Sequence, residues 1–210
     1  MDELLFFLKG VALGLAIAAP LGPVGALCIS RTLQRGFWAG LAGGLGTALA
    51  DGAYAALAAA GFAAFAHILD NVSVPLRLVG GAFMLWLGIS SFKPRPVVAA
   101  ASIGAGDLLR TTASTFVLTI TNPATVLSFA AIFAGLGLAG ADDRLSSATV
   151  VAGVFSGSML WWLILAGSVA LLHKRLPAGF SMWVARIAGA IMILFGVLAF
   201  GSVIYGWVAG

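Results

Sequence analysis

The sequence is poor in charge. Asp, Glu, Lys and Arg make up 9% of its 210 residues, whereas hydrophobic residues make up 61% and the mean hydropathy is +1.11. A water-soluble domain of this length needs far more charge on its surface. The composition therefore excludes a soluble globular protein and predicts an all-α integral membrane protein that is surrounded by the lipid bilayer.

Cysteine is almost absent, since Cys28 is the only one in the sequence. A single thiol cannot form an intramolecular disulfide, and it excludes a thiol relay or a multi-cysteine metal site. The sequence also has no nucleophile elbow, phosphate-binding loop or metal-ligand cluster, so we expect neither an enzyme nor a cofactor. The net charge of +4 does not indicate a nucleic-acid partner, because the basic residues occur singly or in pairs between apolar blocks.

Long apolar blocks are what the sequence has instead. Six of them come near the roughly 20 residues that a membrane helix needs. The expected spans are residues 4–29, 37–65, 76–92, 116–138, 148–172 and 183–208. The longest connection, residues 93–112, reads KPRPVVAAASIGAGDLLRTT. We interpret it as a cytoplasmic linker between a first half, residues 1–92, and a second half, residues 113–210.

Lys and Arg are distributed unevenly between the two sides of the expected bundle. The connections after the first, third and fifth spans, with their flanks, hold eight of the eleven basic residues. The opposite side holds Lys9, Arg77 and Arg144, together with five acidic residues. Because basic residues gather on the cytoplasmic side, this bias predicts that both termini lie outside the cytoplasm.

Two segments indicate an internal repeat. GAFMLWLGISSF (81–92) and GAIMILFGVLAF (189–200) share five identities without a gap, at a spacing of 108 residues. The first and fourth spans also share a helix-breaking proline among small residues. Three spans per repeat require the second copy to enter from the other side of the membrane. The sequence thus predicts two inverted three-helix repeats with broken helices one and four, a pattern typical of transporters. Chance similarity between two Gly-rich helices is the alternative.

The first helix break is expected in APLGPVG, residues 19–25. A proline inside a helix removes a backbone hydrogen bond and clashes with the preceding turn. In lipid, such a break is tolerated only where protein or a wet cavity satisfies the freed backbone groups. Pro20, Gly22, Pro23 and Gly25 therefore predict an unwound segment at a functional site, with a simple packing kink as the alternative.

The second break is expected in TITNPATV, residues 119–126. Thr121 and Asn122 are suited to cap a half-helix that begins at Pro123 and continues through Thr125. The start of such a half-helix exposes amide groups and the positive end of a dipole, which favour a carboxylate. A local cap without a ligand is the alternative.

Asp51 is the only acidic residue well inside an expected span. An ionised carboxylate is costly there, so it normally faces the interior and marks a path for an ion, a proton or a substrate. Thr47 lies one turn before it on the same face. The alternative is a protonated Asp51 that only bonds a neighbouring helix.

These stretches carry a family resemblance. APLGPVGALCISRTLQRGFWAGLAGGLGTALADGAYAALAAAG, TITNPATVLSFAAIFAGLG, GVFSGSMLWW and RIAGAIMILFGVLAFG resemble the LysE-type translocators, a family of bacterial inner-membrane amino-acid exporters that includes lysine and RhtB-like exporters. The family's motifs match the prolines of the first span, the Gly-rich approach to Asp51 and the Asn-Pro of the fourth span. The resemblance covers nearly the whole chain and implies proton-driven export of amino acids or similar small polar solutes.

The sequence departs from the family's pattern at two places. Many members have Pro-Gly-Pro-Asn in the first span, whereas this chain has an inserted Leu21 and places Val24 after the second proline. Many members also carry Lys after the Asn-Pro, where this chain has Ala124. These departures bear on the polarity of the substrate.

We therefore expect a secondary active transporter with alternating access and proton antiport, in which Asp51 binds the substrate amine, a coupling proton, or each in turn. The alternatives are export of another small solute or ion, and a passive channel on the same fold. The oligomeric state is left open, with a homodimer among the options. The expected substrate-binding residues are Pro20, Gly22, Pro23, Gly25, Thr47, Asp51, Thr121, Asn122, Pro123 and Thr125.

Overall fold

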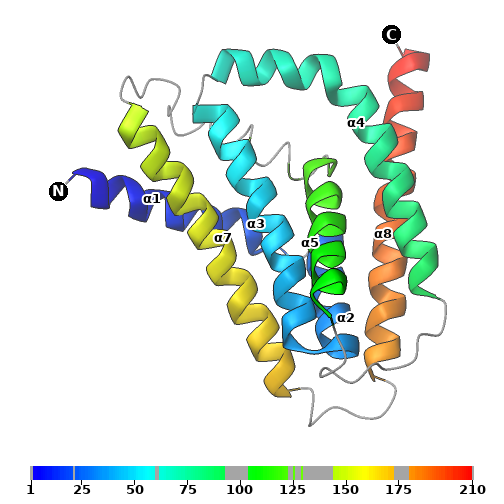
Figure 1. The fold of residues 1–210 in the computed structure, drawn as a ribbon. Helices are drawn as coiled ribbons and strands as arrows, with labels where there is room; N and C mark the ends of the chain where they lie inside the picture. Colours follow the sequence, from blue (N-terminus) through cyan, green and yellow to red (C-terminus); the bar gives the residue numbers. More distant parts are fainter. Residues whose placement is uncertain are drawn as a thin grey trace.

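The protein is helical throughout the part that its structure describes (Figure 1). The computed structural model describes residues 2–20, 22–59, 62–92, 104–122, 125, 129, 144–172 and 180–209. The helices are α1 (Asp2–Ala18), α2 (Pro23–Arg35), α3 (Phe37–Ala59), α4 (Phe62–Ser91), α5 (Ala105–Ile120), α7 (Arg144–Leu172) and α8 (Phe180–Ala209). The expected all-α class is confirmed.

The first expected span is broken at the predicted place. Helix α1 ends at Ala18, and α2 begins at Pro23 with Gly22 as its N-cap. The two helices meet at an angle of 83°. The break follows from the residues, because Pro20 disfavours helical backbone just before it, and Pro23 suits a first helical position that needs no N–H acceptor.

Two helices within the described ranges are long and apolar enough to cross a membrane alone: Ala148–Leu172 within α7 and Met182–Gly206 within α8. The bent pair of α1 and α2 adds a third if it forms one broken span. The first of these stretches matches the expected fifth span, and the second lies within two residues of the expected sixth at each end.

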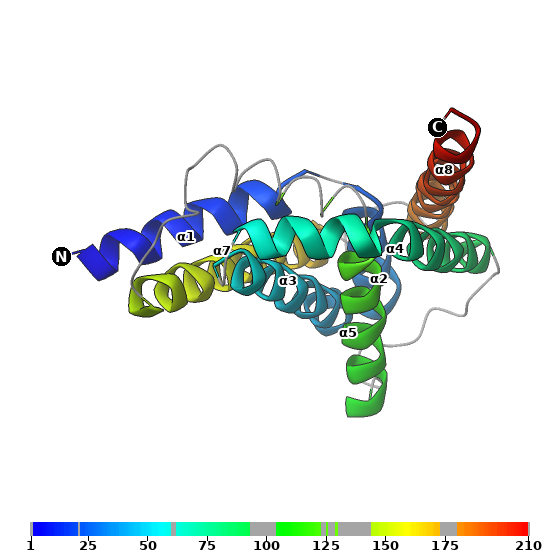
Figure 2. The ribbon, with the colours of Figure 1, turned by 90° about the horizontal axis from the view of Figure 1, so that it is seen from above.

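Two helices begin earlier than the expected spans. Helix α4 begins at Phe62, whereas residues 62–65 were expected to end the second span and residues 66–75 to form a connection. Pro75 lies inside α4, so this proline does not end the helix. Helix α4 bends on its way across the bundle (Figures 1 and 2). Helix α5 begins at Ala105, so residues 105–112 of the expected linker are helical.

Glycines allow several helices to approach closely. A Cβ on Gly10 would lie 2.9 Å from the Cα of Gly153, and a Cβ on Gly14 would lie 2.8 Å from the backbone nitrogen of Ser158. These contacts join α1 to α7. A Cβ on Gly46 would lie 2.8 Å from the backbone nitrogen of Phe116, which joins α3 to α5. Small residues at these positions hold the backbones close enough for polar side chains to meet between the helices.

Helices α4 and α8 run antiparallel, side by side (Figure 1), and meet through residues that match in the two similar segments, 81–92 and 189–200. A Cβ on Gly88 would lie 2.8 Å from the carbonyl oxygen of Gly189, and a Cβ on Gly196 would lie 2.9 Å from that of Gly81. Because each glycine lies 108 residues from its counterpart, these are two copies of one contact.

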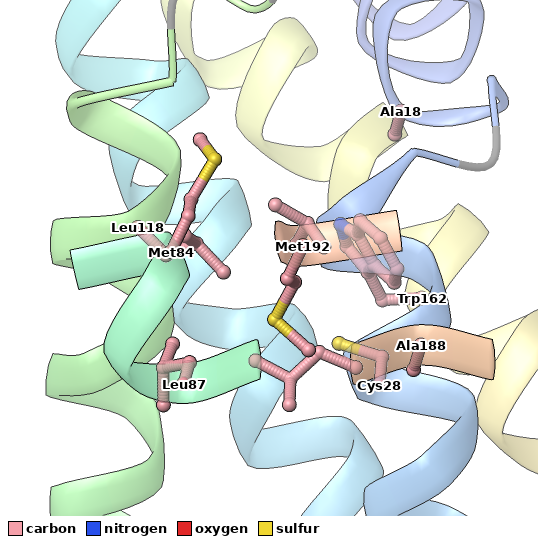
Figure 3. Close-up of a cluster of buried hydrophobic side chains, with 10 residues drawn as sticks. Ala18, Cys28, Met84, Leu87, Leu118, Trp162, Ala188 and Met192 are labelled. Carbon is pink, nitrogen blue, oxygen red and sulfur yellow. The ribbon is translucent and has the colours of Figure 1, made fainter. Parts of the chain in front are cut away.

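A core of buried apolar side chains lies where the helices of both halves converge (Figure 3). Met84 from α4 and Met192 from α8, which are matched in the repeat, are both fully buried in it. Cys28 from α2 and Trp162 from α7 complete the side facing the break between α1 and α2. This core fixes α2 beside α7 and so holds one wall of the site described next.

Candidate substrate site around Asp51

A small cavity of about 60 Å³ lies where the break between α1 and α2 meets α3, α5 and α7. It is lined by Ile17, Ala18, Pro20, Gly22, Val24, Gly25, Thr47, Asp51, Thr119, Asn122, Thr125 and Trp162. We call it the Asp51 pocket. It brings together residues from both expected helix breaks and from the middle of α3.

Asp51 is the one acidic or basic residue in the lining of this pocket, and only 1% of its surface is exposed. Its Oδ2 accepts a hydrogen bond of 2.6 Å from the hydroxyl of Ser158 on α7. Its Oδ1 is buried and has no hydrogen-bond partner among the described residues. A buried carboxylate oxygen without a hydrogen-bond partner is costly, so Oδ1 of Asp51 is suited to accept a hydrogen bond from a ligand.

An indole N–H lies in the same pocket. Trp162 is 3% exposed, and its Nε1 has no hydrogen-bond partner among the described residues. Gly44 on α3 makes room for its ring, because a Cβ there would lie 2.6 Å from Cγ of the indole. The residues that line the pocket thus include one unsatisfied acceptor and one unsatisfied donor.

The end of α5 is held against α3 beside the pocket. The hydroxyl of Tyr54 donates a hydrogen bond of 2.5 Å to the carbonyl oxygen of Ile120, in the last residue of α5. The hydroxyl of Thr119 lies 3.4 Å from that of Thr47. Helix α5 ends at the Thr-Asn that was expected to mark a break, and Asn122 lines the pocket.

Seven of the ten expected binding residues line the Asp51 pocket: Pro20, Gly22, Gly25, Thr47, Asp51, Asn122 and Thr125. Pro23 is buried but does not line it. Thr121 is also buried without lining it, and its hydroxyl donates a hydrogen bond of 2.6 Å to the carbonyl oxygen of Val117. Pro123 lies outside the described residues.

The binding residues expected from the sequence do not include Ser158, Thr119 or Trp162. The signal for Thr119 was available, since Thr111, Thr115 and Thr119 follow one another at intervals of four residues and share one face of α5. Ser158 is one of several hydroxyl residues in an apolar helix, and only its position opposite Asp51 identifies it.

A second, larger cavity of about 320 Å³ lies near the ends of α2, α4 and α5. Its lining is Leu27, Ser30, Arg31, Gln34, Arg35, Trp86, Leu87, Ser91, Asp107, Arg110, Thr111 and Ser114. We call it the arginine vestibule. No group of three or more His, Cys, Asp or Glu side chains in the described ranges is arranged to hold a metal ion.

A buried carboxylate that faces a cavity beside a broken helix, within an apolar helical bundle, is the kind of site found in membrane translocators. The profile of the LysE type translocator family matches residues 15–202. The chain belongs to this family, whose members are transporters and not enzymes, and the resemblance noted in the sequence is confirmed.

Three relatives extend over most of the chain. A candidate amino acid efflux protein, YcgF of Bacillus subtilis (strain 168), is 29% identical over 198 residues, which cover 90% of this chain and 92% of the relative. The arginine exporter protein ArgO of Pectobacterium carotovorum subsp. carotovorum (strain PC1) is 28% identical over 214 residues, covering 96% and 98%. The uncharacterized membrane protein YahN of Escherichia coli (strain K12) is 28% identical over 174 residues, covering 80% and 77%. No solved structure matches the chain.

Proposed function

We propose that the protein exports amino acids or related small polar solutes across the bacterial inner membrane, by proton antiport with alternating access. The observation that carries this proposal is the unpartnered Oδ1 of Asp51 in a pocket that both expected helix breaks reach. Membership of the translocator family and the names of two relatives, an amino acid efflux protein and an arginine exporter, support the substrate class.

The pocket has suitable groups for both ends of a zwitterion. Gly22 provides no side-chain cap and Pro23 has no N–H, so the first-turn amides of Val24 and Gly25 lack acceptors within α2. Together with the positive end of the α2 dipole, these amides favour the substrate carboxylate. Asn122 and Thr125 line the same pocket, at the place where the sequence predicts a second half-helix start, and the Trp162 N–H is a further donor.

Asp51 binds the substrate ammonium when it is ionised. Protonation from the outside neutralises it and releases the amine, and loss of that proton to the cytoplasm prepares it for the next substrate. One carboxylate that holds either a proton or an ammonium, but not both, couples the two fluxes in opposite directions. Ser158 holds Oδ2 during this exchange, so that Oδ1 is the oxygen that changes partner.

The inverted repeat supplies the two states that alternating access needs. The repeated glycine contact between α4 and α8 supports this architecture, because the two helices are antiparallel and pair matched residues in both directions. A twofold axis that relates two antiparallel helices is perpendicular to them, and for helices that cross the membrane it therefore lies in the membrane plane. The two three-helix halves, with six spans in total, would rock against each other about the fixed Asp51 pocket.

The orientation follows from the basic residues. The C-terminal end of α2 and the N-terminal end of α5 meet in the arginine vestibule, with Arg31, Arg35 and Arg110 among its lining residues. The N-terminal end of α8, with Arg186, lies at the same end of the bundle in Figure 1. By the positive-inside rule this end faces the cytoplasm, and both chain termini face the periplasm.

The test is counterflow in proteoliposomes. Vesicles loaded with one unlabelled amino acid at a time, across a panel of side-chain types, are diluted into the same labelled amino acid with and without an imposed pH gradient. We expect uptake of label for a subset of the panel, and acceleration when the gradient favours proton antiport. Flux of every solute at one rate, unaffected by the gradient, would instead indicate a passive channel.

A further inference from the structure

The two cavities differ in what they can hold. The Asp51 pocket, at about 60 Å³, has room for only a few water molecules, because each occupies roughly 10–15 Å³ of such volume. The arginine vestibule, at about 320 Å³, falls within the roughly 300–1,000 Å³ of small-molecule sites. In this conformation the vestibule, and not the Asp51 pocket, is large enough for an amino acid.

The charged lining of the vestibule is predominantly positive. The lining includes three arginines, Arg31, Arg35 and Arg110, but only one acidic residue, Asp107. Guanidinium groups match the planar carboxylate and bind it through two parallel hydrogen bonds. Three guanidinium groups at the border of an apolar bundle favour a ligand that carries a carboxylate over one that carries only an amine.

Arg31 contacts a row of threonine hydroxyl groups on α5 that extends from the vestibule to the Asp51 pocket. Its Nη1 donates a hydrogen bond of 2.6 Å to Oγ1 of Thr115, and its Nη2 donates one of 2.8 Å to Oγ of Ser114. Thr111 and Thr119 lie one turn to either side of Thr115 on α5. Thr111 lines the vestibule and Thr119 lines the Asp51 pocket, so the row joins the two cavities.

The bonds of Arg31 to the threonine and serine hydroxyls are bonds to neutral oxygens. A carboxylate in the vestibule offers a charge-assisted, bidentate partner, which is roughly twice as strong an acceptor as a neutral oxygen. Arg31 has a flexible side chain whose guanidinium already borders the cavity, so a ligand carboxylate there can take the place of Ser114 and Thr115 as its acceptor.

We propose that the arginine vestibule is a second binding site, at which Arg31, Arg35 and Arg110 hold the carboxylate of an amino-acid-like substrate before it reaches Asp51. The choice of an amino acid as ligand rests on the proposed function. The site itself rests on the cavity, its three arginines and the hydroxyl row.

The test is protection of a cysteine from alkylation in detergent-solubilised protein, which needs no transport. Cys28→Ala removes the native thiol, and Ser91→Cys places a reporter on the vestibule wall, where the native hydroxyl bonds the carbonyl oxygen of Leu87 in its own helix. Gln34→Cys is a second reporter if the first variant does not fold. The probes are L-arginine with its amine analogue agmatine, and L-leucine with isoamylamine, so that each pair differs only by the carboxylate.

We expect at least one amino acid to slow alkylation by about tenfold at a concentration about ten times its dissociation constant, and its amine to have no effect. Arg35→Gln and Arg110→Gln should each weaken this protection. Arg186→Gln, an exposed arginine of α8 outside the vestibule, is the matched control and should not. Absence of protection by both amino acids, equal protection by the amines, or an equal effect of Arg186→Gln would overturn the proposal.

The same experiment separates the two proposals. Asp51→Asn lies in the other pocket and should leave protection unchanged while it abolishes coupled export. Protection without any counterflow would support the vestibule site and contradict the exporter function. Counterflow without protection would support the exporter function and contradict the vestibule site.

Discussion

Asp51 on α3 accepts a hydrogen bond of 2.6 Å from Ser158 on α7. The bond joins the second expected span of the first half to the second expected span of the second half, across the interface of the proposed repeats. It satisfies Oδ2 and leaves the buried Oδ1 without a hydrogen-bond partner among the described residues. The carboxylate is thus fixed by one oxygen and available through the other.

Asp51→Asn should abolish export that is driven by a pH gradient. The amide keeps the shape of the carboxylate and still has an oxygen that can accept from Ser158, but it carries no charge for an ammonium and takes up no coupling proton. Export is measured in proteoliposomes, and folding is checked by a monodisperse elution profile in detergent. Undiminished, proton-coupled export by a folded Asp51→Asn protein would contradict the assignment.

Ser158→Ala should destabilise the protein, and the loss should depend on Asp51. Hydrogen bonds between membrane helices contribute about 1 kcal/mol, with measured values up to roughly 2 kcal/mol. In a double-mutant cycle with Asp51→Ala, followed by thermal unfolding in detergent, we expect a coupling energy of about 1 kcal/mol. Additive effects of the two substitutions would show that the bond contributes nothing measurable.

Gly88→Ala and Gly196→Ala should destabilise the protein to similar extents. In each variant the new Cβ meets a carbonyl oxygen of the facing helix at 2.8–2.9 Å, which requires α4 and α8 to move apart. Overpacking of this kind costs about 1–3 kcal/mol. The measurement is again thermal unfolding in detergent.

The matched control for this pair is Gly201→Ala, on the same helix as Gly196. Apart from the adjacent backbone of its own helix, no atom of the described residues lies within 4 Å of a Cβ at Gly201, so the substitution should be neutral or should stabilise α8 by up to about 1 kcal/mol. If all three alanine variants unfold at one temperature, the close contact of α4 and α8 has no energetic weight.

The proposed orientation predicts a labelling pattern in intact cells. The buried Cys28 is first replaced by Ala. A membrane-impermeant thiol reagent should then label a cysteine added after Gly210. It should label Gly104→Cys, at the exposed start of α5, only after permeabilisation. Labelling of Gly104→Cys in intact cells would reverse the orientation.

The sequence predicted the helix break well because its cause is local. Pro20 and Pro23 restrict the backbone on their own, whatever the rest of the chain does. The long apolar helices α7 and α8 were predictable for a similar reason, since hydropathy alone determines which stretches suit lipid. The early starts of α4 and α5 were not, because hydropathy measures apolarity and not helicity. The helical residues around Asp107 and Arg110 are too polar to register as a span.

The residues of the candidate site were predictable only where their signal is local. Asp51 is conspicuous wherever it lies, because a charge in an apolar span is costly. Its partner Ser158 is 107 residues away, and nothing in the sequence near Ser158 indicates which helix it faces. From the sequence, the arginines of the vestibule indicated only the orientation of the chain in the membrane. That they line a cavity was not predictable, because the approach of Arg31 to Thr115 depends on how α2 and α5 pack.

The antiparallel glycine contact between α4 and α8 is self-complementary: each surface pairs with an inverted copy of itself. A chain of half the length that inserts into the bilayer in both directions would find the same partner in its own twin. The proposed inverted repeat can therefore arise from such a dimer by duplication and fusion of one gene. Copies fused in this way are free to diverge, and in this sequence only the first half has an acidic residue in the middle of an expected span.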